Sequence, residues 1–179
     1  MGPRDALLEK VVAYAAANGI AGRSLREIAA GVGTSHRMLL HHFGSREGLM
    51  TAIVQIIEAR QRELMTSLAD QAVAPRELMT RLWEQVSSPE LRPFVRLFFE
   101  VFAMAAQGVP GTQDMLTNLT DPWLSDGAAA AERLGLPADV HALRLGVAVS
   151  RGLLLDLLAG ADPVEVNAAY QVFIEKFEP

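Results

Sequence analysis

Apolar residues recur along most of this chain at steps of three and four, the period that places them on one face of a helix. The first run predicts a helix over about residues 4–18. A second begins after Ser24, where Glu27 follows at the spacing of a reciprocal capping box, and it stops at the glycine turn 31–33. Because runs of β-branched residues are few, the pattern predicts an all-α protein.

A further short helix is predicted over about residues 36–42, with Thr34 or Ser35 as its N-cap. The expected inward positions are Val32, Met38 and Leu39, and the expected outward positions are His36, Arg37, Leu40 and His41. Two short helices joined by a glycine turn form a helix-turn-helix pattern. The second helix has the size of one that enters the major groove of DNA.

Longer helices are predicted after residue 45. They are expected over about 46–70, 75–86, 89–106, 112–134, 139–159 and 163–177, with a break in the fourth at Asp121-Pro122. We therefore expect about nine helices in two domains. Residues 1–48 would form a three-helix DNA-binding domain, and residues 49–179 a helical domain for effector binding and dimerisation.

The charge is divided unevenly between these two parts. The whole chain carries a net charge of −5, yet residues 1–50 hold six Lys and Arg against four Asp and Glu, or +2. The remainder holds ten basic and 17 acidic residues, or −7. A slightly basic head on an acidic body suits a local contact with phosphates and repels DNA elsewhere, although +2 alone is weak support.

Five segments of the first 50 residues also carry a family resemblance, namely 15–20, 24–29, 33–35, 39–43 and 45–49. In order and spacing they resemble the tetracycline-repressor (TetR) family of transcriptional regulators. Two positions depart from that pattern: Leu40 stands where the family usually has tyrosine, and Arg46 where it has lysine. Arg46 keeps the positive charge for a phosphate contact, whereas Leu40 cannot donate a hydrogen bond to a phosphate.

The candidate DNA contacts follow from this placement. Arg37 and His36 lie in the first turn of the second helix, which reaches base edges in this motif, and arginine can bind guanine through two hydrogen bonds. Without the motif, both would be interpreted as solvated surface residues. The whole expected DNA-facing set is Arg23, Ser24, Thr34, Ser35, His36, Arg37, Leu40, His41 and Arg46, most of which would position the head on phosphates.

Other kinds of chemistry find little support in the sequence. No nucleophile motif, phosphate-binding glycine loop or zinc-protease motif is present, and there is no cysteine, so we expect neither an enzyme nor a cofactor. His41 and His42 are adjacent and face different ways on a helix, which is poor geometry for a metal site. Charged residues interrupt the longest apolar stretches, and the N-terminus lacks a signal-peptide core. We therefore expect a cytoplasmic protein without a membrane span.

Aromatic residues gather in the middle of the chain. At helical spacing they are more often core than ligand-binding, but members of the resembling family bind small effectors there. The resemblance therefore implies a pocket for a largely apolar small molecule, with a solid core as the alternative. The candidate pocket residues are Trp83, Phe94, Phe98, Phe102, Leu116, Asn118, Trp123 and His141.

The last two predicted helices are apolar on more than one face, which predicts a homodimer through a four-helix bundle. The candidate interface residues are Leu143, Gly146, Val147, Leu154, Val166, Tyr170 and Phe173. Such a dimer would present two recognition helices to a palindromic double-stranded operator. We expect a ligand-responsive repressor, and the alternative is an all-α small-molecule-binding module that does not read DNA sequence.

Overall fold

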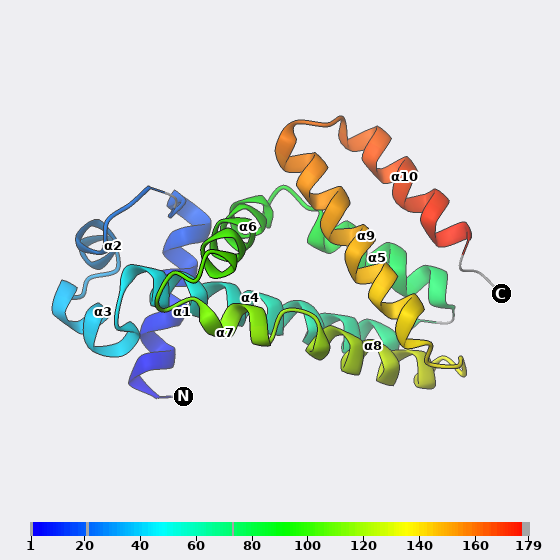
Figure 1. Cartoon of the computed structure of the whole chain (residues 1–179), viewed down its shortest axis with the longest axis horizontal. Coiled ribbons are helices and arrows are strands. Elements are labelled where there is room, and N and C mark those ends of the chain that lie inside the picture. The colour runs from blue at the N-terminus through cyan, green and yellow to red at the C-terminus, as the bar shows by residue number, and fades with distance from the viewer. Residues whose placement is uncertain (1, 21, 73, 177–179) are drawn as a thin grey trace. The chain divides into compact units, whose positions relative to one another are not determined.

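The computed structural model describes residues 2–20, 22–72 and 74–176, and all regular structure within these ranges is helical (Figure 1). The helices are α1 (Pro3–Asn18), α2 (Leu25–Gly31), α3 (His36–Phe43), α4 (Arg46–Ala69), α5 (Pro75–Val86), α6 (Arg92–Ala106), α7 (Gln113–Thr117), α8 (Asp121–Arg133), α9 (Val140–Ala159) and α10 (Pro163–Glu175). The predicted all-α class with an N-terminal helix-turn-helix is confirmed. Phe177, expected in the last helix, lies outside the described residues.

The predicted helix over residues 112–134 is two helices, which is why the described ranges contain ten helices rather than about nine. α7 ends at Thr117, and α8 starts at Asp121 with Pro122 in its first turn. Proline fits there because the first-turn amides have no partner within the helix. Pro122 therefore begins a helix after the break instead of interrupting one. In the described ranges, no helix combines the length and apolarity that crossing a membrane requires.

The chain packs as two compact units. The head unit consists of Met1–Glu58 and Glu90–Asn118, and the body unit consists of Ala59–Pro89 and Leu119–Pro179. α4 therefore begins in the head unit and ends in the body unit. The boundary expected at residue 48 concerned the DNA-binding motif, and it stays a prediction.

The head unit buries one apolar face from each of its longer helices. α1 packs against α2 and α6, and α2 packs against α3 (Figure 1). Val11, Ile28, Leu39, Ile53 and Val101 have no exposed surface. Each side chain of this kind stabilises the fold by about 1.5–3 kcal/mol through burial. The core of the head unit therefore includes Val101 of α6 as well as residues from the first four helices.

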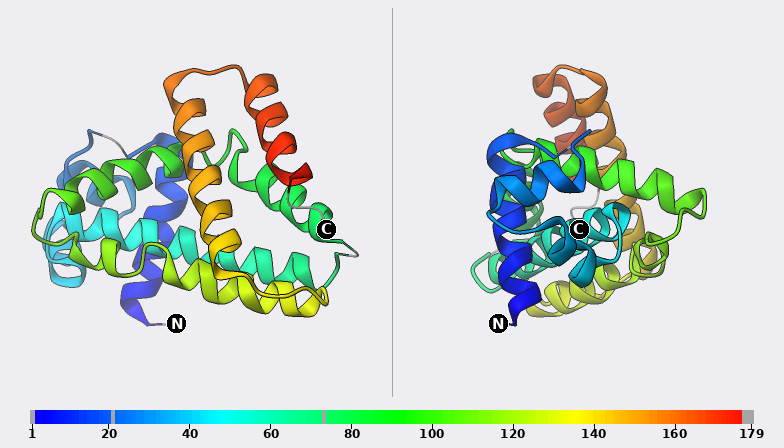
Figure 2. Two further views of the ribbon diagram at one scale, coloured as in Figure 1. Left: turned by 45° about the vertical axis from the view of Figure 1, so that its right-hand side comes forward. Right: turned by 90° about the vertical axis from the view of Figure 1, so that its left-hand side faces the viewer.

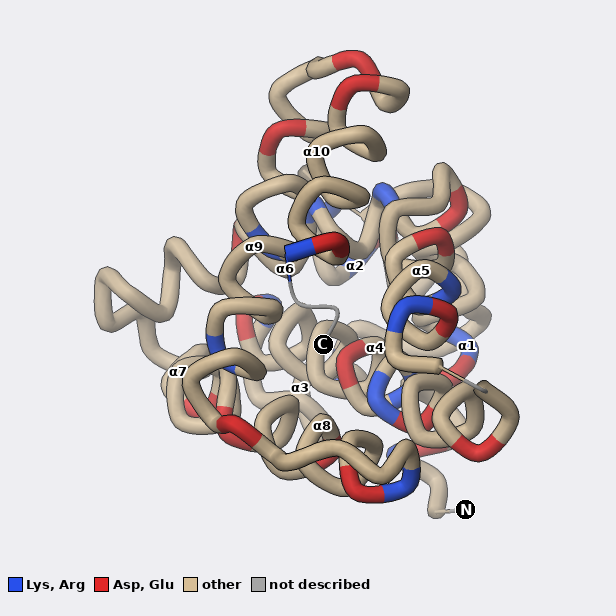
Figure 3. The backbone as a smooth tube through the Cα atoms, turned by 90° about the vertical axis from the view of Figure 1, so that its right-hand side faces the viewer, with Lys and Arg blue, Asp and Glu red and all other residues tan. Residues whose placement is uncertain are grey.

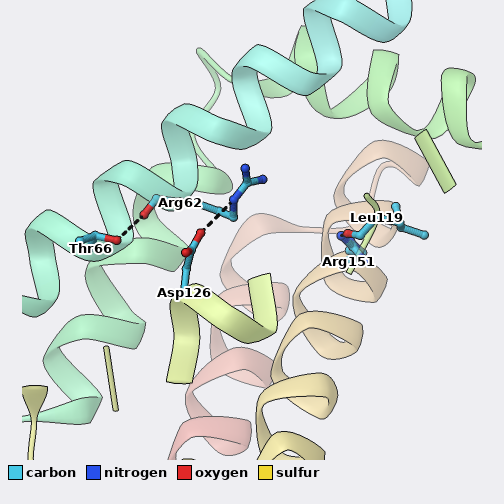
Figure 4. Close-up of polar contacts among 5 residues, drawn as sticks. All are labelled: Arg62, Thr66, Leu119, Asp126 and Arg151. Atoms are coloured by element: carbon cyan, nitrogen blue, oxygen red, sulfur yellow. Dashed lines mark hydrogen bonds and ion pairs between the residues drawn. The ribbon is translucent and has the colours of Figure 1, made fainter. Parts of the chain in front are cut away.

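In the body unit, α9 lies between α8 and α10, and α10 also packs on α5 (Figure 2). Polar contacts tie the elements together. The Arg62 Nε of α4 donates to the Asp126 carboxylate of α8 at 3.0 Å (Figure 4). Arg151 of α9 donates to the Leu119 carbonyl (Figure 4). It also donates to the Thr120 hydroxyl at 3.1 Å, so α9 holds the segment that precedes α8.

Candidate nucleic-acid interface

The start of α2 is fixed by the predicted capping box. The Glu27 amide donates to the Ser24 hydroxyl oxygen at 3.3 Å, and the Ser24 amide donates to the Glu27 carboxylate at 2.8 Å. The Ser24 hydroxyl donates to the same carboxylate oxygen at 2.7 Å. These bonds, from the hydroxyl first and then the amide, lower the pKa of Glu27. Ser24 thus orients α2 as well as standing in the candidate DNA-facing set.

The second helix of the helix-turn-helix, α3, begins at His36 and is capped by Ser35, whose hydroxyl oxygen accepts from the Met38 amide at 3.1 Å. Leu39 and Phe43 are buried and anchor the helix, while Arg37, Leu40 and His41 are exposed, as predicted. The prediction for Met38 is wrong, because its side chain is 42% exposed.

The reason for the Met38 error is geometric. Residues turn by about 100° along a helix, so position 38 lies more than about 90° from the direction shared by Leu39 and Phe43. Val32, Thr34 and His36 are half-buried, and Ser35 is exposed. The outward side of α3 is therefore centred on Arg37 and His41, with Met38 and Leu40 on its two flanks.

The Arg23 guanidinium donates two hydrogen bonds inside the head unit. Its Nε donates to the Gly19 carbonyl and its Nη2 to the Asn18 carbonyl, both at 3.1 Å, and the guanidinium lies 5.6 Å from the centre of the Tyr14 ring. Arg23 therefore caps the carboxyl end of α1. A guanidinium has five N–H donors, so these two bonds leave others for a phosphate.

Arg46, the first residue of α4, also has internal partners. Its Nε donates to the Arg23 carbonyl at 3.0 Å, and its Nη2 lies 3.6 Å from Glu100 Oε1 of α6. The sequence offered Arg46 as a phosphate contact and gave no sign of these partners. The Arg46 side chain is 25% exposed and the Glu100 side chain 34% exposed, so water reaches both partners of this ion pair.

The first turns of α4 are held by the loop that follows α6. The Thr51 hydroxyl, which has one hydrogen to donate, lies 2.9 Å from the Glu47 carbonyl of its own helix and 3.1 Å from the Gly111 carbonyl. Gly111 has φ +89°, and a Cβ there would lie 3.1 Å from the Ser45 hydroxyl and 3.3 Å from the Gly48 amide nitrogen. Ser45 accepts from the Gly48 amide at 2.9 Å, which confirms it as the cap of α4. Sequence reasoning missed Thr51 and Gly111, since nothing local marks their contact.

The candidate pocket residues of the head unit are of two kinds. Phe94 and Phe98 are buried in its core, whereas Phe102 and Leu116 are exposed. Asn118 is exposed, and its side-chain amide donates to the Asp114 carbonyl at 3.2 Å.

In the body unit, Trp83 stacks on Tyr170 with ring centroids 4.4 Å apart, and its Nε1 donates to Asn167 Oδ1 at 2.8 Å. Trp123 is half-buried against an apolar cluster, and His141 is exposed. Trp83 thus makes core contacts within the body unit. Five of the eight candidate residues belong to the head unit and three to the body unit, and the expected pocket stays a prediction.

The candidate dimer residues are divided in a similar way. Val166 and Tyr170 are buried against Trp83 inside the body unit. Their burial comes from this chain's own core, so they are not free for a second copy. The half-buried members of the candidate set are Leu143, Gly146, Val147, Leu154 and Phe173.

A different set is exposed on α9 and α10. The apolar stripe, as we name it, consists of Leu145, Ala148, Gly152, Leu155, Val164, Ala168 and Val172. Leu155 is 51% exposed and Val164 is 71% exposed. The α9 members follow one another at alternating steps of three and four, the spacing of a helix–helix seam.

Elsewhere in the described residues, the charge and the placement of His, Asp and Glu side chains do not favour binding of phosphates or metal ions. Acidic residues gather where α9 turns into α10, at the top of Figure 3, and they are Asp156, Asp162 and Glu165. This end of the body unit does not attract phosphates. Among the described residues, no group of three His, Asp or Glu side chains is placed to hold a metal ion.

Comparison with known proteins agrees with this geometry. Residues 7–53 match the family model described as "Bacterial regulatory proteins, tetR family". No curated protein sequence matches the chain.

Several solved structures share the fold over nearly the whole chain. A TetR-family transcriptional regulator from Rhodococcus sp. is 24% identical, with 96% of each chain covered and a TM-score of 0.73. A transcriptional regulator from Rhodococcus sp. RHA1 is 20% identical, with 97% of this chain and 94% of that chain covered and a TM-score of 0.77. The multidrug binding protein EbrR, complexed with proflavin, is 22% identical, with 96% and 98% covered and a TM-score of 0.66. The helix-turn-helix residues of this chain thus match the model of the TetR family of bacterial regulatory proteins, and the chain as a whole shares the fold of solved transcriptional regulators, one of them described as TetR-family.

Proposed function

We propose that this protein is a cytoplasmic, non-enzymatic repressor that binds a palindromic operator as a homodimer and is released by a small, largely apolar effector. The observation that carries the proposal is the outward side of α3. Its helix is capped by Ser35 and anchored by Leu39 and Phe43, and it presents Arg37 and His41 on a head unit that matches a DNA-binding family.

Base reading is assigned to Arg37, with His36 beside it. Arg37 is exposed in the first turn of α3, where a guanidinium can donate two hydrogen bonds to guanine. Replacing Arg37 by alanine should cost about 1–3 kcal/mol of binding free energy and relax specificity at one base position. Equal affinity of Arg37→Ala and wild type for the operator would show that another residue reads the bases.

The experiment that tests DNA reading is selection from a random duplex library, followed by titrations of the selected duplex at several salt concentrations. A regulator should enrich a two-fold symmetric site, and its affinity should fall steeply as salt rises because phosphate binding releases counterions. A small-molecule-binding module without DNA reading, the alternative function, would enrich no sequence and show no such slope.

Dimerisation is proposed through the apolar stripe on α9 and α10. A chain that stays monomeric has no reason to leave Leu155 and Val164 in water on neighbouring helices, whereas a two-fold partner would bury the same stripe from both copies. The resulting symmetry matches a palindromic operator with half-sites about one helical turn or more apart.

Analytical sedimentation measures the oligomeric state directly. The wild type should sediment as a dimer of 19.4 kDa chains at micromolar concentration, and Leu155→Glu should shift it to the monomer. Leu116→Glu is the matched control, because Leu116 is similarly exposed and belongs to α7 of the head unit rather than to the stripe. A wild-type monomer, or equal effects of the two substitutions, would contradict the proposed interface.

The effector is supported by an unsatisfied polar atom in the body unit. Gln61 Oε1 is buried and has no hydrogen-bond donor within the described part of the chain. Such an oxygen costs about 1–3 kcal/mol, so a bound molecule that brings one donor on an apolar body would relieve that cost. The EbrR structure shows that a protein of this fold can hold proflavin.

A screen of apolar compounds tests whether the protein responds to such an effector. A true effector should raise the melting temperature and lower operator affinity, and the operator should lower effector affinity by the same factor. Gln61→Leu should keep the fold and DNA binding while weakening the response. If no compound moves both properties, the protein is regulated by its abundance alone.

A further inference from the structure

Two large apolar side chains lie exposed on the recognition helix. Met38 is 42% exposed and Leu40 is 37% exposed, on a helix of eight residues that Leu39 and Phe43 already anchor. The core of the head unit therefore does not account for either side chain. Their exposure leaves apolar surface in water on the face of the molecule that would approach DNA.

Their positions relative to Arg37 are set by helix geometry. With about 100° of rotation per residue, Leu40 lies about 60° to one side of Arg37 and Met38 about 100° to the other side. A helix lying in the major groove would thus carry one apolar side chain on each side of its arginine.

The major groove offers one kind of apolar partner. The C5 methyl of thymine is the apolar group among the base edges exposed there, while the other edge atoms of the four bases are mostly donors and acceptors. Neither leucine nor methionine can donate a hydrogen bond to those atoms or to a phosphate. Burial of a methyl is therefore the contact by which these side chains can discriminate between bases.

We propose that Met38 and Leu40 read thymine methyl groups that flank the base pair bound by Arg37. Each operator half-site then contains thymine on either side of that base pair. This inference rests on the proposed DNA-reading function and adds which chemical feature of the operator is recognised. Contact of the same side chains with deoxyribose is the competing possibility, and it would carry no sequence preference.

Deoxyuridine provides the test, because it lacks only the methyl of thymine and keeps its hydrogen-bonding edges. Using the full-length protein and the duplex selected from the random library, each thymine is replaced in turn by deoxyuridine. At two positions of the half-site, affinity should fall by about fourfold, the effect of burying one methyl-sized group.

The variants assign each methyl to a side chain. Leu40→Ala should lose the sensitivity at one of the two positions and Met38→Ala at the other. Val140→Ala, a change at a similarly exposed apolar residue of α9 outside the candidate sets, should keep both. Since Met38 and Leu40 lie outside the core, both variants should melt close to the wild type, which separates lost contacts from lost folding.

Three results would overturn the inference while leaving DNA reading intact: a selected half-site without thymine, wild-type binding that is indifferent to every deoxyuridine, or sensitivity that survives in both α3 variants. Enrichment of no sequence at all would overturn the proposed function and this inference together. The two failures are therefore distinguishable.

Discussion

The ion pair between Arg46 and Glu100 makes a quantitative prediction about DNA affinity. Arg46 is the position at which the family resemblance expects a phosphate contact, yet its Nη2 lies 3.6 Å from the Glu100 carboxylate in the protein alone. A phosphate and Glu100 therefore compete for one guanidinium. Glu100→Gln removes the competing charge and nearly preserves the shape of the side chain.

The structure limits the size of the effect. The two side chains are 25% and 34% exposed, so water screens the pair, and pairs of this kind contribute about 0.2–1 kcal/mol. Glu100→Gln should lower the free energy of unfolding by no more than about 1 kcal/mol. Because Arg46 no longer gives up that free energy when it binds a phosphate, DNA affinity should rise by about 1.4-fold to fivefold at low salt.

Fluorescence anisotropy with the selected duplex, at several salt concentrations, measures this change. Asp126→Asn is the matched control, because it removes the 3.0 Å ion pair to Arg62 in the body unit and should cost similar stability without changing DNA affinity. Arg46→Ala should weaken binding to all sequences alike and reduce the salt slope by about one.

Two outcomes would refute the reasoning. If Glu100→Gln binds DNA no more tightly than the wild type, Glu100 orients Arg46 and does not compete for it. If the gain persists in an Arg46→Ala background, the effect is general charge repulsion and does not pass through the ion pair.

Three further predictions concern stability. Gly48→Ala should destabilise the fold by about 3 kcal/mol in chemical denaturation, because its Cβ would lie 2.2 Å from the backbone oxygen of Phe43. Because the pKa of Glu27 is lowered in the folded state, its contribution to stability is present above the ordinary pKa of 4.5 and is lost as pH falls through the folded pKa. In Glu27→Gln, the free energy of unfolding should therefore fall less steeply as the pH is lowered. Burial raises the pKa of Tyr170 from 10.0, so its contribution to stability is present below pH 10 and is lost as pH rises through the folded pKa. The difference in absorbance at 295 nm between the wild type and Tyr170→Phe should show that this tyrosine ionises above pH 10.

Local signals in the sequence were sufficient to predict the two helices of the helix-turn-helix. Ser24 with Glu27, and Ser35 before α3, are caps whose partners lie three residues away, so spacing alone predicts their hydrogen bonds. Met38 failed because α3 is short, and two turns leave the inward direction poorly defined by apolar positions. Arg46 with Glu100 could not be predicted, since the two residues meet only through the packing of distant segments.

The apolar faces of α9 and α10 show a different limit. A residue buried by its own chain and a residue buried by a second copy have the same chemical character, so periodicity reveals that several faces are apolar without telling which one meets which partner. Val166 and Tyr170 fit the seam spacing, yet they pack on Trp83. The same ambiguity applied to Trp83 itself, whose indole serves a stack and a hydrogen bond within the body unit.

The head unit is assembled from two stretches of sequence, with Ala59–Pro89 between them. Closing a loop of that length costs little free energy, because the cost grows only with the logarithm of length, but it imposes an order on synthesis. A nascent chain that ends before α6 lacks Leu97 and Val101, both almost fully buried in the mature protein. Translation that stops early therefore leaves the helix-turn-helix without part of its core. We expect a truncated message to yield a fragment that proteases degrade.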